Sequence, residues 1–232
     1  FSGDGGTSEG DFHEALNVAS VWSLPVLFCI ENNGYGLSTP SSEQYNCESI
    51  ADRGVGYGME SHVIEGNNIL EVFSKVNAIA KSVRQNPRPV LIEFKTFRMR
   101  GHEEASGTKY VSQELLDSWA KKDPISNYED YLIQEKEISL KEIEDFKISY
   151  TEEIKNSLQL AFDEPAITPD LKTELSDVFN PFDYSASATE PSSQMERMRL
   201  VDAISVGLKQ SMEVHSDLVI MGQDIAEYGG VF

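Results

Sequence analysis

Cysteines are scarce in this sequence, and long apolar runs are absent. The 232 residues include two cysteines, Cys29 and Cys47, and neither belongs to a C-x-x-C pair. This disfavours a structural zinc site and fits a reducing compartment, so we predict a cytoplasmic protein. No apolar stretch reaches the roughly 18–20 residues needed to span a bilayer, and no secretory signal is visible. We therefore predict no membrane partner.

Basic residues are also few. Lysine and arginine number 19 against 39 aspartates and glutamates, for a formal net charge of −20. Nucleic acids and anionic membranes are disfavoured as partners, because both require basic patches. Residues 1–110 hold 14 acidic and nine basic residues, whereas the remaining 122 hold 25 and ten. A phosphate-bearing ligand stays possible, because a cluster of basic and histidine residues lies in the less acidic part: Lys95, Arg98, Arg100 and His102.

Residues 1–97 alternate strand and helix patterns, which predicts an α/β fold with a doubly wound parallel sheet. A strand is expected to end at residues 1–2, and others to cover 25–30, 61–65 and 90–97. The run at 25–30 is apolar throughout, which is typical of a strand buried on both faces. Helices are expected at about 9–23 and 68–85.

The apolar spacing of each helix predicts which side faces the core. The first helix is expected to begin at a Thr7 or Ser8 cap. Its core side is predicted to carry Phe12, Leu16, Val18, Ala19 and Trp22. The core side of the second helix is predicted to carry Leu70, Phe73, Val76, Ile79 and Ala80.

Composition divides the rest of the chain. Residues 111–162 are helical and highly charged, which indicates scaffold and subunit interface. The segment 163–196 has four prolines and eight acidic residues against one lysine, which predicts an acidic junction. A helix at 198–213 and a short strand at 218–221 predict the start of a second α/β domain. The predicted domains are therefore 1–162, 163–196 and 197–232, and the absence of an initial Met leads us to expect a fragment of a longer polypeptide.

Two motifs carry the chemistry: Gly3-Asp4-Gly5-Gly6 and Asn32-Asn33. Asp4 and Asn33 are separated by about one βαβ unit, so they are expected at the ends of adjacent parallel strands. A carboxylate, an amide oxygen and a backbone carbonyl form a hard-oxygen site that suits Mg²⁺. The glycines allow a diphosphate to approach the backbone, and the next helix directs its first amides toward it. Either motif alone is more simply a glycine turn, but the pair predicts a functional site.

The residues around these motifs resemble a known family. The stretch GDGGTSEGDFHEALNVASVWSLPVLFCIENNGYGLSTPSSEQY is similar to the α subunit of the decarboxylating component of 2-oxo acid dehydrogenase complexes, which depends on thiamine diphosphate. The segments ADRGVGYGM, VIEGNN and KKDPISNYEDYL continue the resemblance to about residue 180. STPSSEQY and LSDVF resemble the branched-chain, 2-oxoisovalerate enzymes more than the pyruvate enzymes. From residue 197 the chain resembles the start of the β subunit, which implies that it spans the junction of a fused α–β polypeptide.

The resemblance assigns roles by position. Asp4 and Asn33 resemble the side-chain Mg²⁺ ligands, and Tyr35 resembles the residue whose backbone carbonyl completes the set. The other residues expected to bind the cofactor are Gly3, Gly5, Gly6 and Arg98. His102 resembles the loop histidine beside the diphosphate and the reacting substrate, and is the predicted catalytic residue.

Other positions depart from the family or have structural roles. Glu31 lies beside the site, at a position that is often basic in branched-chain enzymes. Mitochondrial members carry a phosphorylatable serine where this chain has Glu103, which argues against that kinase control, and Ser106 is a weak substitute. We interpret the remaining histidines as structural or surface residues: His13, His62 and His215.

The resemblance implies oxidative decarboxylation of a 2-oxo acid with thiamine diphosphate and Mg²⁺. The acyl group then passes to lipoyl groups of an acyltransferase core. The implied partners are the remaining α and β portions, assembled as α2β2 or as a dimer of fused chains. Pyruvate or acetoin is the alternative substrate, and a non-catalytic assembly segment is the alternative function. In this family a β-subunit glutamate protonates the cofactor, and this residue lies beyond Phe232, so we expect the 232 residues alone to be inactive.

Overall fold

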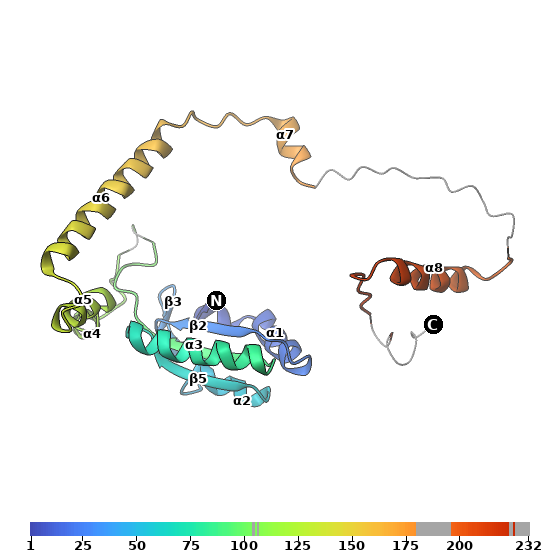
Figure 1. The fold of residues 1–232 in the computed structure, drawn as a ribbon, viewed down its shortest axis with the longest axis horizontal. Helices are drawn as coiled ribbons and strands as arrows, with labels where there is room; N and C mark the ends of the chain where they lie inside the picture. The colour runs from blue at the N-terminus through green and yellow to red at the C-terminus, as the bar shows by residue number, and fades with distance from the viewer. Residues whose placement is uncertain (104, 106, 180–195, 223–224, 226–232) are drawn as a thin grey trace. The chain divides into compact units, whose positions relative to one another are not determined.

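The computed structural model describes residues 1–103, 105, 107–179, 196–222 and 225 (Figure 1). The chain divides into two compact units, Phe1–Glu164 and Pro165–Phe232. The first unit contains a four-stranded parallel sheet in the order β1-β2-β6-β5 and a small antiparallel pair, β3-β4. The predicted α/β fold with a parallel sheet is therefore confirmed for this unit.

The elements of the first unit follow one another in a βαβ pattern. The strands are β1 (Ser2–Gly3), β2 (Leu27–Asn32), β3 (Tyr35–Gly36), β4 (Thr39–Pro40), β5 (Glu60–Glu65) and β6 (Val90–Lys95). The α-helices are α1 (Gly10–Val21), α2 (Arg53–Gly56), α3 (Ile69–Gln85), α4 (Gln113–Ala120), α5 (Pro124–Gln134) and α6 (Leu140–Asp163). Three short 3₁₀ helices are η1 (Gly5–Ser8), η2 (Ser41–Glu43) and η3 (Ile50–Asp52).

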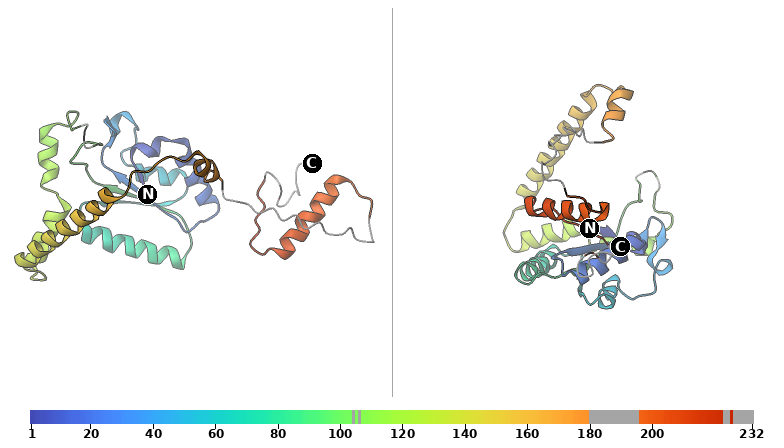
Figure 2. Two further views of the ribbon diagram at one scale, coloured as in Figure 1. Left: turned by 90° about the horizontal axis from the view of Figure 1, so that it is seen from above. Right: turned by 90° about the vertical axis from the view of Figure 1, so that its right-hand side faces the viewer.

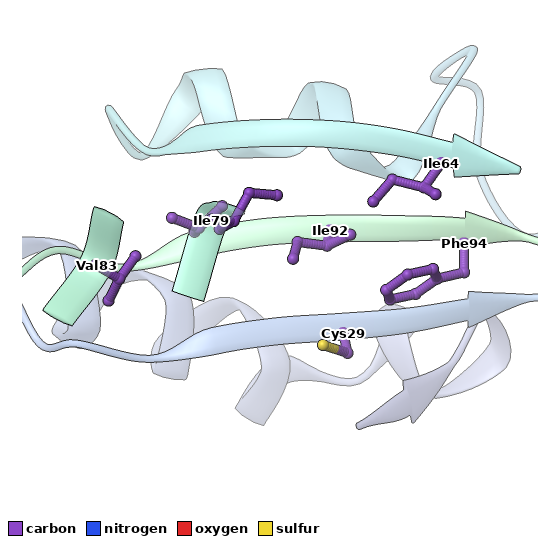
Figure 3. Close-up of a cluster of buried hydrophobic side chains, with 7 residues drawn as sticks. Cys29, Ile64, Ile79, Val83, Ile92 and Phe94 are labelled. Carbon is purple, nitrogen blue, oxygen red and sulfur yellow. The ribbon is translucent and has the colours of Figure 1, made fainter. Parts of the chain in front are cut away.

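Strand β6 lies between β2 and β5 and contributes side chains to two hydrophobic cores, one on each face of the sheet. One core lies under α3 and contains Val90, Ile92 and Phe94 of β6 with Cys29, Ile64, Ile79 and Val83 (Figure 3). The other lies under α1 and contains Leu91 with Leu16, Ile30, Ile50 and Met59. Figure 2, left, shows α1 and α3 on opposite sides of the sheet. Both faces of the sheet are therefore covered, as expected for an all-parallel sheet.

The start of α1 differs from the prediction. The residues Gly5–Ser8 form η1, and α1 begins after Glu9, which makes no side-chain capping bond. The Thr7 hydroxyl is buried and donates instead to the carbonyl of Asp4 at 2.7 Å. The prediction of a Thr7 or Ser8 cap was therefore wrong, because the tight 3₁₀ turn comes before the helix.

The core sides of both helices are also narrower than predicted. Leu16 and Ala19 of α1 are buried, but Val18 and Trp22 are 41% and 61% exposed. In α3 the residues packed against the core are Val72, Val76, Ile79 and Val83. Phe73 lies about one residue's rotation from this stripe and Leu70 lies nearly opposite to it, and both are exposed. Apolar residues on two sides of one helix make the buried side ambiguous from sequence alone.

In the second unit the described residues form two helices, α7 (Leu171–Ser176) and α8 (Leu200–Val214). Residues 218–221 pair with no strand in the described part of the chain, so the predicted strand there was wrong. An apolar run forms a strand only where a neighbour accepts its backbone hydrogen bonds. Residues 180–195 of the predicted junction, and most of 223–232, lie outside the described residues. Within the described residues, no helix is long and apolar enough to cross a membrane.

Glu60 forms an ion pair at the amino ends of β5 and β6. It lies 2.7 Å from His62 Nε2 and accepts from Arg88 Nε at 2.8 Å. The hydrogen bond from His62 lowers the pKa of Glu60; burial opposes this, and Arg88 adds to the lowering. A carboxyl whose pKa falls on folding stabilises the fold above its unfolded pKa, and this contribution is lost as the pH drops through its folded pKa.

We therefore expect Glu60→Gln to destabilise the protein at neutral pH by about 1 kcal/mol or less, as is usual for a partly exposed pair. The difference from wild type is expected to shrink as the pH falls below the ordinary glutamate value of 4.5. Urea unfolding of both proteins between pH 7 and pH 3 measures it. A difference that stays constant across this range would contradict the assignment.

Candidate functional site

The carboxyl ends of β1 and β2 lie side by side. The register pairs Ser2 with Ile30 and Gly3 with Glu31, so Asp4 and Asn33 leave the sheet at the same edge. A cavity of about 560 Å³ opens there. Its lining includes all eight predicted site residues: Gly3, Asp4, Gly5, Gly6, Asn33, Tyr35, Arg98 and His102. It is completed by Ser8, Gly36, Leu37, Thr39 and Gln44. The structure thus brings together residues that are up to 99 positions apart in the sequence.

Asp4 is almost fully buried, with 1% of its surface exposed. Its backbone carbonyl accepts from the Thr7 amide at 3.1 Å, which closes the turn of η1. Its carboxylate accepts from Gln44 Nε2 at 3.3 Å. A carboxylate offers about four acceptor positions, so this bond leaves capacity for a cation.

Asn33 is held in a turn between β2 and β3. Its Oδ1 accepts from the backbone amide of Tyr35 at 3.1 Å. Gly34 between them has φ +83°, a conformation that residues with a Cβ adopt rarely. An amide oxygen has two lone pairs, so Asn33 Oδ1 can accept this bond and still coordinate a cation. Asp4 and Asn33 together supply the hard oxygens that Mg²⁺ prefers.

The glycines beside Asp4 pack closely against neighbouring parts of the chain. A Cβ on Gly5 would lie 3.0 Å from the Cα of Gly36, and one on Gly6 would lie 2.6 Å from Ser2 Oγ. A Cβ at Gly5 would therefore crowd the Gly36 backbone, whereas a Cβ at Gly6 would displace the Ser2 side chain. The first helical amides at the cavity belong to η1, because Gly5 and Gly6 are part of it. This corrects the expectation that the longer helix α1 would supply them.

Arg98 connects the loop after β6 to the connection between β3 and β4. Its guanidinium donates to the Leu37 carbonyl at 2.5 Å, to the Tyr110 hydroxyl at 2.9 Å and to His102 Nδ1 at 3.1 Å. Arginine only donates, so in this arrangement Nδ1 is the acceptor and Nε2 of His102 carries the proton. His102 is exposed and therefore accessible from the cavity.

Aromatic rings support the same loop. Tyr35 makes edge contacts with Phe97, at a centroid distance of 6.3 Å, and with Tyr110, at 5.5 Å. Phe97 stacks on Trp119 of α4 at 5.4 Å. The hairpin β3-β4, the loop and α4 are thus packed together, which fixes the wall of the cavity that carries Arg98.

Lys95 is close in sequence to Arg98 and His102 but is not among the residues that line the first cavity. It donates to the buried carboxylate of Glu93 and lines a second cavity of about 430 Å³, on the other side of Asn33 and Tyr35. Its ammonium group is thus paired with Glu93. Glu31 is exposed and pairs in register with Gly3 and Phe94. Ser106 lies outside the described residues.

Two polar residues that support the site were not predicted from the sequence, one in the cavity wall and one behind it. Gln44 bonds to Asp4 across 40 positions, and no motif marked it. Glu93 did carry a signal, since it is a charged residue within an apolar strand. The other histidines have structural contacts: His13 Nδ1 lies 2.8 Å from the Tyr57 hydroxyl, and His62 contacts Glu60. Among the described residues, no three His, Cys, Asp or Glu side chains are grouped to hold a metal.

Comparison with known proteins identifies relatives of the sheet-containing part of the chain. The dehydrogenase E1 component family matches residues 1–170. The α subunit of an acetoin:2,6-dichlorophenolindophenol oxidoreductase from Bacillus subtilis is 37% identical over 166 residues, 71% of this chain and 49% of that protein. The α subunit of 3-methyl-2-oxobutanoate dehydrogenase from Mycobacterium tuberculosis is 39% identical over 167 residues, 71% of this chain and 45% of that protein.

A plant protein extends the match further along the chain. The mitochondrial 2-oxoisovalerate dehydrogenase subunit alpha 2 of Arabidopsis thaliana is 36% identical over 183 residues, 78% of this chain and 38% of that protein. The chain thus spans about half the length, or less, of the curated relatives that it matches.

Proposed function

The chain belongs to the dehydrogenase E1 component family, and we propose that it forms the cofactor-binding part of a thiamine diphosphate-dependent 2-oxo acid dehydrogenase. One observation carries this proposal: the eight residues singled out by sequence all line a single cavity at the carboxyl ends of β1 and β2. Ligand sites of open parallel sheets occur at this edge.

The residues of the cavity fit Mg²⁺ and a diphosphate. Asp4 and Asn33 would hold the metal through their side-chain oxygens, with the backbone carbonyl of Tyr35 as a third ligand. The backbone of Gly5 and Gly6 lines the cavity and would accommodate the diphosphate there. Thiamine diphosphate, when bound, supplies the nucleophilic carbon and the electron sink for loss of CO₂ from a 2-oxo acid.

Arg98 and His102 would bind the anionic groups of this reaction, Arg98 by holding the ring of His102 and His102 by donating a hydrogen bond. The Arg98 guanidinium lies at the cavity wall and holds the His102 ring through Nδ1. The protonated Nε2 of His102 is then a hydrogen-bond donor for the diphosphate or for the carboxylate of the 2-oxo acid. The bonds from Arg98 to Leu37 and Tyr110 keep this donor in place without involving the cofactor.

We propose a branched-chain 2-oxo acid as the substrate, with acyl transfer to the lipoyl groups of an acyltransferase core. Two relatives are named for 3-methyl-2-oxobutanoate and 2-oxoisovalerate, and another for acetoin. The proposed organisation stays as the sequence predicts it: an α-like domain at 1–162, a junction at 163–196 and the start of a β-like domain at 197–232. The remaining α and β portions would then be the structural partners, in an α2β2 assembly or a dimer of fused chains.

A parallel assay tests the substrate. The complete enzyme is incubated with thiamine diphosphate, Mg²⁺ and either 2-oxoisovalerate, pyruvate, acetoin or 2-oxoglutarate. We expect kcat/KM for 2-oxoisovalerate to exceed that for pyruvate by about 10-fold or more, because each methylene that fits an apolar pocket contributes about 1–3 kcal/mol. A preference for pyruvate or acetoin would replace the substrate assignment. No turnover of any substrate would favour the alternative of a non-catalytic assembly segment.

A further inference from the structure

A charged residue is fully buried in the centre of the sheet. Glu93 of β6 has 0% of its surface exposed, and its neighbours in the strand, Ile92 and Phe94, are core residues. It points to the face of the sheet opposite to those two side chains, because residues alternate along a strand. A buried carboxylate is tolerated only when its oxygens are bonded.

Both oxygens of Glu93 have donors. Oε1 accepts from Lys95 Nζ and, at 2.6 Å, from Asn32 Nδ2. Oε2 accepts from the Ser49 hydroxyl and, at 2.9 Å, from the Ala51 amide. Burial raises the pKa of Glu93, but the hydrogen bonds from these four groups outweigh it and leave the pKa below its ordinary value. The carboxylate is thus an ionised anchor joining β2 to the first residues of η3 and its N-cap Ser49.

Asn32 connects Glu93 to the turn that carries the proposed metal ligands. Asn32 Nδ2 also donates to the Tyr45 hydroxyl at 2.9 Å, and its Oδ1 accepts from the Gly34 amide at 3.0 Å. Both ends of the amide are therefore engaged, and a flipped amide would place its NH₂ group against the Gly34 N–H. Gly34 is the residue at φ +83°, in the turn that carries Asn33 and Tyr35.

We propose that Glu93 is a positioning residue for the metal site: through the Asn32 amide it fixes the Gly34 turn that presents Asn33 and Tyr35. This inference rests on the proposed function, because the ligand roles of Asn33 and Tyr35 come from it. Glu93 does not line the cavity, so it acts without touching the metal or the cofactor. Supporting partners of this kind determine whether a ligand is in coordinating geometry before the metal arrives.

The test measures metal affinity rather than turnover. Mn²⁺ replaces Mg²⁺ as a paramagnetic probe, and its dissociation constant in the complete enzyme is measured by electron paramagnetic resonance at saturating thiamine diphosphate. We expect Glu93→Gln to raise this constant by about 10–100-fold, the usual effect of losing a partner behind a ligand. Glu60→Gln is the matched control, because it breaks another carboxylate ion pair at the opposite end of the same strands. The control is expected to bind Mn²⁺ as wild type does.

A double-mutant cycle separates positioning from general loss of stability. If Glu93 acts through Asn32, the Asn32→Ala variant raises the Mn²⁺ dissociation constant by a similar factor, and the double variant raises it no further. Fully additive effects, or an unchanged constant in folded Glu93→Gln, would overturn the inference. If Glu93→Gln does not fold, Asn32→Ala alone tests the link, and wild-type affinity in that variant overturns it. Failure of wild type itself to bind Mn²⁺ with the cofactor would count against the proposed function instead.

Discussion

Replacement of Asp4 by alanine is expected to weaken Mg²⁺-dependent binding of thiamine diphosphate by more than about a hundredfold. Loss of a group behind a metal ligand already lowers affinity by about 10–100-fold, so loss of the ligand itself has a larger effect. Among the described residues that line the 560 Å³ cavity, Asp4 is the only carboxylate. Without it, the proposed metal site would keep only the neutral oxygens of Asn33 and Tyr35 among the described residues. Titration calorimetry with thiamine diphosphate, in the presence and absence of Mg²⁺, measures the change.

Two controls make this result specific. Asp130→Ala removes an exposed carboxylate from α5 and is expected to leave binding unchanged. Asp4→Asn keeps the size of the side chain and its capacity to bond Gln44, but removes the charge, so it is expected to lose binding without unfolding. Wild-type affinity in a folded Asp4→Ala enzyme would contradict the proposed metal site and, with it, the proposed function.

Replacement of His102 by alanine is expected to lower kcat by about 10²–10⁴-fold, the range for loss of a group that handles protons at the reacting centre. Thiamine diphosphate affinity is expected to change much less, because Asp4, Asn33 and the glycine backbone remain. The measurement is kcat at saturating cofactor and substrate, together with the cofactor dissociation constant. Both values are needed, since a residue that only binds the diphosphate would change the second more than the first.

His62→Gln is the matched control for this variant. His62 lies in β5 and contacts Glu60 near the amino end of that strand, at the opposite edge of the sheet from the cavity. Its removal is expected to leave kcat unchanged. A His102→Ala enzyme with wild-type kcat would show that the loop histidine takes no part in the reaction, whereas the metal site would be unaffected by that outcome.

The convergence of Asp4 and Asn33 could be predicted from the sequence, because their separation matches one βαβ unit and parallel strands end at one edge. The contacts of Gln44 with Asp4 and of Arg98 with Leu37 could not. These contacts span 40 and 61 positions and depend on how two irregular loops fold over the sheet edge. No periodicity describes such loops, so only the three-dimensional structure shows which side chains meet.

The position of Lys95 shows a second limit. Lys95 is close in sequence to the loop that carries Arg98, but alternate residues of a strand share one face, and Lys95 donates to Glu93 two residues before it. Glu93 shows that a residue can stand out in the sequence before its role is known. A single acidic residue within Val90–Phe94 was visible in the sequence, but its meaning required knowledge of its four donors.

The engagement of Lys95 with Glu93 has a thermodynamic consequence for the cavity on the other side of the turn. Among the described residues that line this cavity, the charged groups are the Asp4 carboxylate and the Arg98 guanidinium, which also bonds His102. A diphosphate entering alone therefore meets no excess of positive charge, and a divalent cation entering alone meets one carboxylate. On the proposed function, each ligand supplies the charge that the other lacks. Their affinities are then reciprocally linked, with each raising the affinity for the other by the same factor.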